Sequence, residues 1–209
     1  MSRLLYIESS PRKKRSSSIE VATVFLNAYR SAHPHDEIAV IDLWKKQLPP
    51  FDGDVIDAKY AIMHEQEHTE AQAKAWKEVE NLISEFKHAD KYVISLPMWN
   101  FGIPYKLKHY IDLLVQPGYA FKVTQSGAYE GLIKGKKLMI VYSRGGAYGS
   151  ETGAEGLDLQ KKYMEIIMPF IGFQNISSLI VEPTLQGDEK KKKAVDLAKE
   201  QALKAAATF

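Results

Sequence analysis

The chain has 209 residues, of which 45% are hydrophobic and 26% are charged, and its formal net charge is +2. This composition is ordinary for one soluble globular domain, and the small net charge gives no argument for binding nucleic acid or an anionic membrane. Because the sequence contains no cysteine, thiol nucleophiles, thiolate zinc sites, cysteine-ligated iron–sulfur clusters and disulfides are excluded. We find neither a transmembrane-length apolar run nor a signal-peptide pattern, and we expect a cytoplasmic protein.

The first half of the chain alternates short apolar runs with amphipathic segments. The run at 3–8 stops at Ser9-Ser10-Pro11 and predicts a buried strand, and a helical pattern follows at 18–30 with serines that can cap its start. Residues 37–43 predict a second strand, whereas 44–70 is an insertion that holds either a short polar helix or irregular chain. A helix at 70–88 has an apolar face made of Ala71, Ala75, Val79, Leu82, Ile83 and Phe86.

The second half of the chain repeats this alternation. A strand at 91–96 leads into a loop at 97–104, and a helix follows with Pro104 in its first turn. Residues 119–135 form a long excursion with room for a short hairpin. The remaining predicted elements are strands at 137–142 and 176–182 and helices at 157–170 and 188–207, with Asp188 as the cap of the last helix.

Five short apolar strands that alternate with helices predict an α/β fold in which an open parallel sheet is covered on both faces. Because β-α-β crossovers are right-handed, ligand sites in such folds lie outside the carboxyl ends of the strands. The loops after the first, third and fourth strands have unusual compositions. We therefore expect the functional site where these three loops meet.

The loop after the first strand, residues 9–18, is rich in serine and leads into a helix. Serine hydroxyls and the free N–H groups of a helix start form an anion site, and the helix dipole adds about 0.3 to 1 kcal/mol. A phosphate is the expected ligand. No G-x-x-x-x-G-K-[ST] loop is present and no G-x-G-x-x-G turn follows the first strand, which disfavours a nucleoside triphosphate or a Rossmann-type dinucleotide. The alternative is a capping loop whose basic residues, Arg12 to Arg15, are solvated.

The other two loops can hold a flat ring. Residues 97–101, Pro-Met-Trp-Asn-Phe, would expose a large apolar patch unless a ligand covers them or the aromatic side chains fold back onto the core. Asn100 supplies both a hydrogen-bond donor and an acceptor. The glycine pair in Ser143-Arg144-Gly145-Gly146 lets the backbone approach a ring closely. Together with the serine loop, this layout suits a mononucleotide with a planar head group.

On these residues the chain resembles the FMN-dependent NADH azoreductase and quinone reductase family. The resemblance runs nearly end to end and includes the weaker Phe170-Ile171-Gly172. It implies the flavodoxin-like fold, a three-layer sandwich with a five-stranded parallel sheet in the order 2-1-3-4-5. It also implies that serines hold the FMN phosphate while the other two loops surround the isoalloxazine ring. The implied cofactor-binding residues are Ser9, Ser10, Ser16, Ser17, Ser18, Pro97, Met98, Trp99, Asn100, Phe101, Ser143, Arg144, Gly145 and Gly146.

By the same resemblance, the expected activity is reduction of quinones and azo compounds by two-electron, ping-pong hydride transfer from NADH or NADPH. The flavin carries this chemistry and no side chain is expected to be catalytic. The family works as a homodimer with active sites at the interface, and Phe121, Tyr148 and Phe170 are expected near the substrate. Some relatives have histidine at the position of Tyr148, and the basic 12–15 segment is unusual in such a loop. These departures leave the acceptor and the choice between NADH and NADPH open.

Three alternatives remain open at this stage. His64-Glu65-Gln66-Glu67-His68 matches H-E-x-x-H, whose histidines can bind zinc, and His88 or Glu85 would be needed as a third ligand. A flavodoxin-type electron carrier would keep the flavin, but such carriers tend to be acidic. A hydrolase similar to acyl-carrier-protein phosphodiesterase lacks a supporting triad or metal–carboxylate group. The four lysines at 190–193 are expected to form a solvated helix face.

Overall fold

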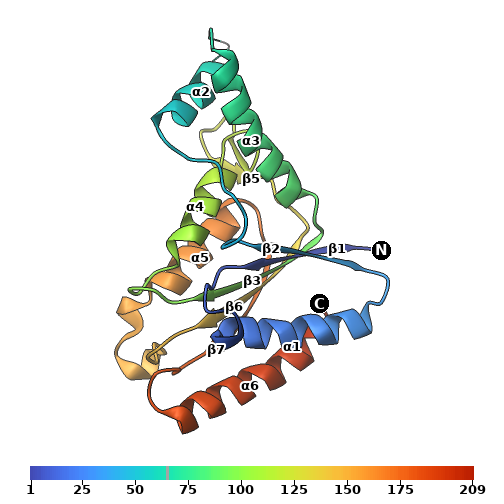
Figure 1. Cartoon of the computed structure of the whole chain (residues 1–209), viewed down its shortest axis with the longest axis vertical. Helices are drawn as coiled ribbons and strands as arrows, with labels where there is room; N and C mark the ends of the chain where they lie inside the picture. The colour runs from blue at the N-terminus through green and yellow to red at the C-terminus, as the bar shows by residue number, and fades with distance from the viewer. Residues whose placement is uncertain (65) are drawn as a thin grey trace.

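The computed structural model describes residues 1–64 and 66–209, and its centre is a twisted parallel sheet (Figure 1). The strands are β1 (Arg3–Glu8), β2 (Glu37–Asp42), β3 (Lys91–Pro97), β6 (Lys137–Ser143) and β7 (Asn175–Val181). They pair in the order β2-β1-β3-β6-β7, and every pairing is parallel. In chain order these are strands 2-1-3-4-5, so the predicted sheet is confirmed.

Burial along the strands follows their place in the sheet. The interior residues of β1, β3 and β6 are buried on both faces, as expected for central strands of a covered parallel sheet. The edge strands β2 and β7 are only partly buried, and Val40 in β2 is 58% exposed. The continuous apolar runs in the sequence therefore mark the three strands whose ends carry the predicted site.

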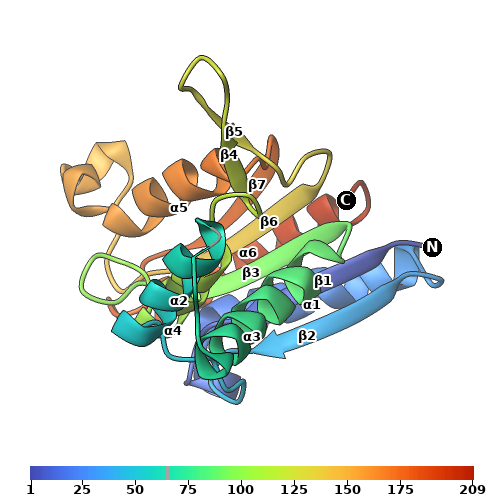
Figure 2. The ribbon, with the colours of Figure 1, turned by 90° about the horizontal axis from the view of Figure 1, so that it is seen from above.

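Helices cover both faces of the sheet (Figures 1 and 2). On one face α1 (Ser17–Ala32) packs beside α6 (Asp188–Ala206), and the core there includes Phe25, Tyr29 and Val195. The opposite core contains side chains of α3 (Glu70–Lys87), α4 (Tyr105–Leu114) and α5 (Leu159–Phe170). The two groups of helices and the sheet between them are the three layers that were predicted.

The two insertions acquire regular structure. Residues 53–63 form α2 (Gly53–Met63), whose cap Asp52 accepts a hydrogen bond from the N–H of Val55 at 3.2 Å. The excursion contains an antiparallel hairpin of β4 (Phe121–Val123) and β5 (Tyr129–Gly131), which extends away from the sheet (Figure 2). Its backbone packs directly on the end of α5, since a Cβ at Gly131 would lie 2.3 Å from the nitrogen of Gly172. A larger residue at position 131 would push the hairpin off its anchor.

Three local predictions were wrong. Ala71 is exposed, and Trp76 is buried instead, because this end of α3 packs against α2 and against Tyr119 of the second insertion. Asp188 is the first helical residue of α6 and Gly187 is the N-cap, where φ is +99°. The helix predicted to contain Pro104 begins one residue later, with proline at the cap.

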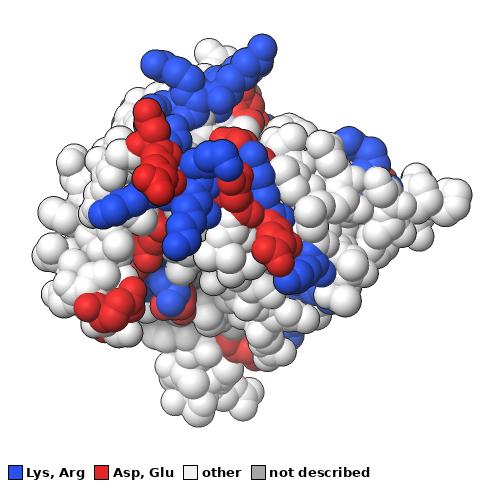
Figure 3. All heavy atoms as spheres, turned by 90° about the horizontal axis from the view of Figure 1, so that it is seen from below, with Lys and Arg blue, Asp and Glu red and all other residues white. Residues whose placement is uncertain are grey.

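Charges of both signs cover the side of the molecule that α6 occupies (Figure 3). In the lysine run, Lys192 lies 2.6 Å from Asp196, one turn along the same helix. Lys199 pairs with Glu20 of α1 at 2.5 Å. These pairs fit the expected solvated helix face. In the part of the chain that the structure describes, no helix has the length and apolar character needed to cross a membrane.

Candidate functional site

The three predicted loops leave the sheet at the same edge. In the register of the strands, Ile7 faces Ile94, and Pro97 faces Ser143. Backbone hydrogen bonds then join the loops to each other: the N–H of Ser9 donates to Ser95 O at 3.1 Å, and the N–H of Met98 donates to Ser143 O at 2.8 Å. The sheet thus brings the serine loop, the aromatic loop and the glycine loop together, as the strand order required.

The serine loop forms a buried cradle at the start of α1. Ser9, Ser10, Ser16, Ser17 and Ser18 are all buried, and the hydroxyls of Ser16 and Ser18 lie 3.1 Å apart. Ser16 occupies the N-cap position, yet its side chain makes no capping hydrogen bond. Within residues 1–64 and 66–209, the helix N–H groups at positions 17–19 have no acceptor. Free N–H groups beside hydroxyls fit a phosphate dianion.

The aromatic loop is a tight two-residue turn. Trp99 and Gly102 exchange both backbone hydrogen bonds, at 3.0 and 2.9 Å, and the two residues between them have positive φ angles: +48° at Asn100 and +68° at Phe101. This backbone matches a type I′ turn, which favours Asn-Gly. Asn suits the first position, whereas phenylalanine at the second is strained. The turn holds the Phe101 ring outward, 43% exposed.

The aromatic and glycine loops line an open cavity of about 460 Å³. It is lined by Met98, Asn100, Phe101, Gly145, Gly146, Tyr148, Leu185 and Gln186. Side chains close around the glycines: a Cβ at Gly145 would lie 2.8 Å from Leu185 Cδ1, and one at Gly146 would lie 3.4 Å from the Tyr148 ring. In the described chain, the N–H groups of both glycines have no acceptor. The cavity therefore offers apolar walls and free donors, which suits a flat heteroaromatic ring with carbonyl groups.

Sequence reasoning missed Leu185 and Gln186, which follow the last strand of the sheet. The N–H of Leu185 donates to Gly145 O at 3.0 Å, and the Thr184 hydroxyl donates to Arg144 O at 2.8 Å. These bonds fix the segment against the glycine loop. Its position after β7, at the carboxyl edge of the sheet, was the available indication.

Trp44 is a second residue that the predictions missed. Its indole Nε1 donates to Ser9 O at 2.9 Å, and its ring lies 5.8 Å from that of Trp99 and 5.6 Å from that of Tyr105. Trp44 follows β2, so it also lies at the carboxyl edge. It links the serine loop to the aromatic loop from the side.

Arg144 is buried and forms ion pairs with two carboxylates of the chain. Its guanidinium lies 2.7 Å from Asp158 and 3.2 Å from Glu182, and it donates to Gln160 at 3.2 Å. Its backbone N–H donates to Val181 O. These contacts hold the base of the glycine loop, and a contact of Arg144 with a cofactor stays a prediction.

The three predicted substrate residues do not meet in one chain. Tyr148 lines the cavity, with its ring 6.4 Å from that of Phe101. Phe121 and Phe170 lie 4.8 Å apart in a separate cluster with Tyr129, where the β4–β5 hairpin meets α5. The cavity is not lined by any member of this cluster.

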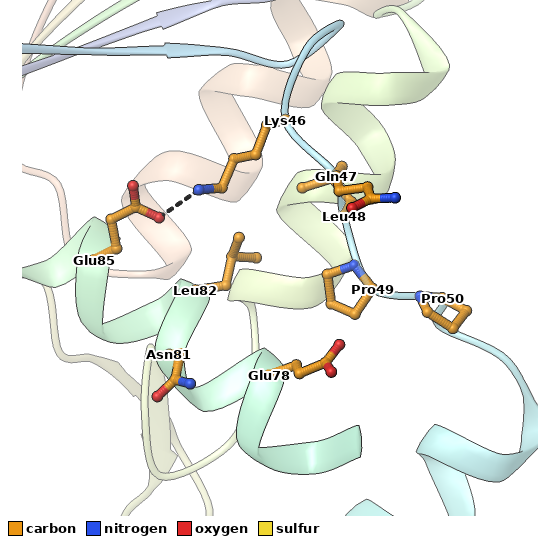
Figure 4. Close-up of a pocket in the computed structure, with 9 residues that line it drawn as sticks. All are labelled: Lys46, Gln47, Leu48, Pro49, Pro50, Glu78, Asn81, Leu82 and Glu85. Atoms are coloured by element: carbon orange, nitrogen blue, oxygen red, sulfur yellow. Dashed lines mark hydrogen bonds and ion pairs between the residues drawn. The ribbon is translucent and has the colours of Figure 1, made fainter. Parts of the chain in front are cut away.

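Another hollow, of about 580 Å³, lies between the loop after β2 and α3 (Figure 4). Its walls include Pro49, Pro50 and the Lys46–Glu85 ion pair, whose atoms are 2.6 Å apart. It contains none of the predicted site residues, and its lining is mostly polar side chains and prolines. This hollow shares no lining residue with the cavity between the aromatic and glycine loops.

The two histidines of the H-E-x-x-H segment do not lie on a common helix, as its zinc chemistry needs. The helix α2 ends at Met63 and α3 begins at Glu70, so His64 and His68 do not share a helical face. Glu65, the base in this hypothesis, lies outside the described residues. Among the residues that are described, no group of three or more His, Asp or Glu side chains is placed to hold a metal ion.

Known proteins resemble the chain over nearly its whole length. A family model described as "Flavodoxin-like fold" matches residues 2–206. An FMN-dependent NADH:quinone oxidoreductase of Desulfotalea psychrophila is 48% identical over 97% of this chain and 95% of its own, and one from Nitratidesulfovibrio vulgaris is 45% identical over 97% and 99%.

Comparison with solved structures places the chain among similar proteins. The azoreductase from Bacillus anthracis str. Sterne superposes with a TM-score of 0.92 at 33% identity, over all of both chains. An FMN-dependent NADH-azoreductase from B. anthracis str. Ames Ancestor, solved in complex with FMN, gives 0.87 at 29% identity over 99% of this chain and 100% of its own. The chain therefore belongs to the flavodoxin-like fold family, close to its FMN-dependent NADH:quinone oxidoreductases.

Proposed function

We propose that this protein is an FMN-dependent NADH:quinone oxidoreductase that also reduces azo compounds. The observation that carries the proposal is the pairing, at one sheet edge, of an uncapped helix start among buried serines with an apolar cavity that has free N–H donors. The names of relatives at 45 to 48% identity support the same activity. A cytoplasmic location is part of this proposal.

The residues present fit FMN at both of its ends. The N–H groups at positions 17–19 and the hydroxyls of Ser16 and Ser18 would hold the phosphate. Met98, Phe101 and Tyr148 would contact the ring, and Asn100 would bond its polar edge. When bound, FMN supplies the exchange of two electrons as hydride between a nicotinamide and an acceptor.

The protein's part in this reaction is binding, orientation and electrostatics. The free N–H groups of Gly145 and Gly146 are placed to stabilise negative charge on a ring that becomes reduced, because fixed donors need no reorganisation. The exposed Phe101 ring and the half-buried Tyr148 ring meet edge to face and offer apolar contacts to a planar substrate. A flat apolar site favours planar acceptors, which include both quinones and azo dyes.

Purification of the protein tests this assignment directly. A yellow protein is expected whose flavin absorbance bleaches when NADH is added without oxygen and returns when a quinone is added. The same experiment with NADPH measures the preference for the donor. A protein that neither retains FMN nor consumes NADH in the presence of a quinone would contradict the proposal.

We further propose that the active form is a homodimer with the site at the interface. The elements α2, α4 and α5 lie along one side of the molecule (Figures 1 and 2). On this side a groove of about 600 Å³ has apolar walls that include Phe51, Ile103, Tyr105 and Tyr163, with Lys108, His109 and Asp112 also lining it. Tyr105 is 62% exposed, next to the aromatic loop. A second copy on this face would cover an apolar surface continuous with the ring cavity.

The separate cluster of Phe121 and Phe170 fits the same arrangement. Since it does not line the cavity of its own chain, it can contact a substrate there only across a dimer interface. Sedimentation analysis should give a dimer for the wild type and a monomer for Tyr105→Glu. Leu203→Glu, which places the same charge on an equally apolar exposed position of α6, should stay dimeric. A wild-type monomer with full activity would contradict the dimer proposal.

A further inference from the structure

Lys13 stands in an unusual backbone conformation inside the serine loop. Its φ angle is +49°, in the left-handed region that glycine adopts most easily. Its ammonium lies 2.5 Å from Glu8 Oε1 and 2.5 Å from Asp42 Oδ1. Because these carboxylates end β1 and β2, the lysine cross-links two neighbouring strands at the carboxyl edge of the sheet.

Hydrogen bonds extend this cross-link to both ends of the serine loop. The carbonyl of Lys13 accepts the N–H of Ser16, the N-cap of α1, at 2.9 Å. On the other side, Asp42 Oδ1 accepts the N–H of Trp44 at 3.1 Å, and the indole of Trp44 donates to Ser9 O at 2.9 Å. A change at Lys13 would therefore reach Ser9, which begins the proposed phosphate cradle, and Ser16, the N-cap of α1.

The charges around Lys13 are arranged around the same cradle. Glu8 directly precedes Ser9, and both carboxylate side chains are largely buried, 15% exposed for Glu8 and 18% for Asp42. Two uncompensated carboxylates at the ends of β1 and β2, beside the start of the serine loop, would repel a phosphate dianion bound there. Burial acts to lower the pKa of Lys13, but the hydrogen bonds to Asp42 and Glu8 outweigh it and raise this pKa above its ordinary value. The ammonium is thus charged at neutral pH.

Neighbouring basic residues do not share this arrangement. Arg12, Lys14 and Arg15 are exposed, and no ion pair joins them to a carboxylate in the described part of the chain. The basic segment that the sequence singled out therefore divides into one inward lysine and three outward side chains. This difference gives a matched control for an experiment on charge.

We propose that Lys13 is a positioning residue for the cofactor phosphate: it holds Ser9 and Ser16 of the serine loop in place and neutralises the two carboxylates at the adjoining strand ends. The inference rests on the proposed function, because it assumes that FMN places its phosphate among these serines. It assigns a role in affinity for the phosphate, not for the flavin ring. The choice of lysine at a position that glycine would occupy without strain follows from this role.

Binding of FMN and of riboflavin, which has the ring but no phosphate, tests the proposal. Both dissociation constants are measured by quenching of flavin fluorescence, with the full chain freed of flavin. Lys13→Gln should raise the dissociation constant for FMN about five- to tenfold, the size expected for one unscreened charge near a partly solvated dianion, and change that for riboflavin less than twofold. Lys14→Gln, with the same charge change one residue away, should bind both ligands as the wild type does.

Two further variants separate charge from backbone strain and from folding. Lys13→Gly relieves the left-handed conformation and should show the same selective loss of FMN affinity, which keeps the test valid if Lys13→Gln folds poorly. Adding Asp42→Asn to Lys13→Gln should restore part of the lost affinity, because one repelling charge is gone. Equal weakening of FMN and riboflavin, or FMN binding by Lys13→Gly as tight as in the wild type, would overturn the proposal. Failure of the wild type to bind FMN would instead contradict the proposed function.

Discussion

The polar groups at the carboxyl edge of the sheet differ from those at the amino edge in how many of them are hydrogen-bonded within the chain. At the carboxyl edge, the N–H groups at positions 17–19 of α1 and those of Gly145 and Gly146 have no acceptor in the described chain, and Phe101 is held in a strained turn. At the amino edge, charged side chains are bound to the chain itself. Asp36, for example, accepts hydrogen bonds from the N–H of Ser2 and from the Tyr29 hydroxyl, both at 2.6 Å.

Lysines at the amino edge reinforce this contrast. Lys91 donates to the Tyr29 hydroxyl at 2.9 Å, and Lys137 donates to the carbonyls of Thr208 and Phe209, both at 3.0 Å. Such bonds fasten α1 and the chain end to the sheet. The difference teaches that one edge contributes stability, while the other keeps donors free for a ligand at some cost in stability. Substitutions at the two edges should therefore act on different measurements.

The largest effect is expected at Ser17, the first residue of α1. In Ser17→Asp, a carboxylate at the helix start interacts favourably with the helix dipole but repels a bound phosphate. FMN affinity should fall about a hundredfold or more, roughly 2.7 kcal/mol, while the melting temperature of the flavin-free protein stays equal or rises. Fluorescence titration and thermal unfolding measure the two quantities. Ser17→Asn, of the same size without charge, is the control, and an equal loss with Asn would show that shape rather than charge is responsible.

Asp36 provides the opposite test at the amino edge. The N–H of Ser2, and then the Tyr29 hydroxyl, hold the pKa of this carboxyl below its ordinary value of 3.8. A depressed pKa adds stability above the unfolded pKa, and this stability is lost as the pH falls through the folded value. Asp36→Asn should cost about 1 to 2 kcal/mol at pH 7 and leave FMN affinity within twofold.

Unfolding in urea at pH 7 and below pH 4 measures this difference. The gap in free energy between the wild type and Asp36→Asn should narrow as the pH is lowered, because the wild-type carboxylate becomes protonated. A gap that is independent of pH would mean that packing, not charge, explains the loss. A large change in FMN affinity would mean that the two edges are coupled through the sheet.

The strand order and the meeting of three loops could be predicted from the sequence, because both follow from general rules for parallel sheets. The apolar runs identified the central strands, and the crossover rule placed the loops at one edge. The rule was applied to the first, third and fourth strands alone. Trp44 and Leu185 follow the two remaining strands, and they were missed although the same rule reaches them.

Other features depend on contacts that no local pattern encodes. The burial of Trp76 depends on Tyr119, which lies in an insertion more than 40 residues away. The Lys13 side chain points inward because it pairs with carboxylates at the ends of two strands. In the sequence nothing distinguishes Lys13 from the basic residues beside it. The Trp99–Gly102 turn could not be predicted from the sequence, because phenylalanine occupies the position where this type of turn usually has glycine. The residues most specific to the site are thus those whose conformation is set by tertiary contacts against their local sequence preference.

The smallest effect on stability is expected at Phe101, where substitutions test whether the carboxyl edge stores backbone strain. Phe101→Gly removes the strain of a φ angle of +68° and should stabilise the flavin-free protein by up to about 1 kcal/mol, while the loss of the ring weakens binding of FMN and of a quinone. Phe101→Ala loses the same ring but keeps a Cβ in the strained conformation. It should therefore bind FMN like the glycine variant and unfold at a lower urea concentration. If alanine and glycine variants are equally stable, the turn stores no strain, and the contrast between the two edges rests on their hydrogen bonds alone.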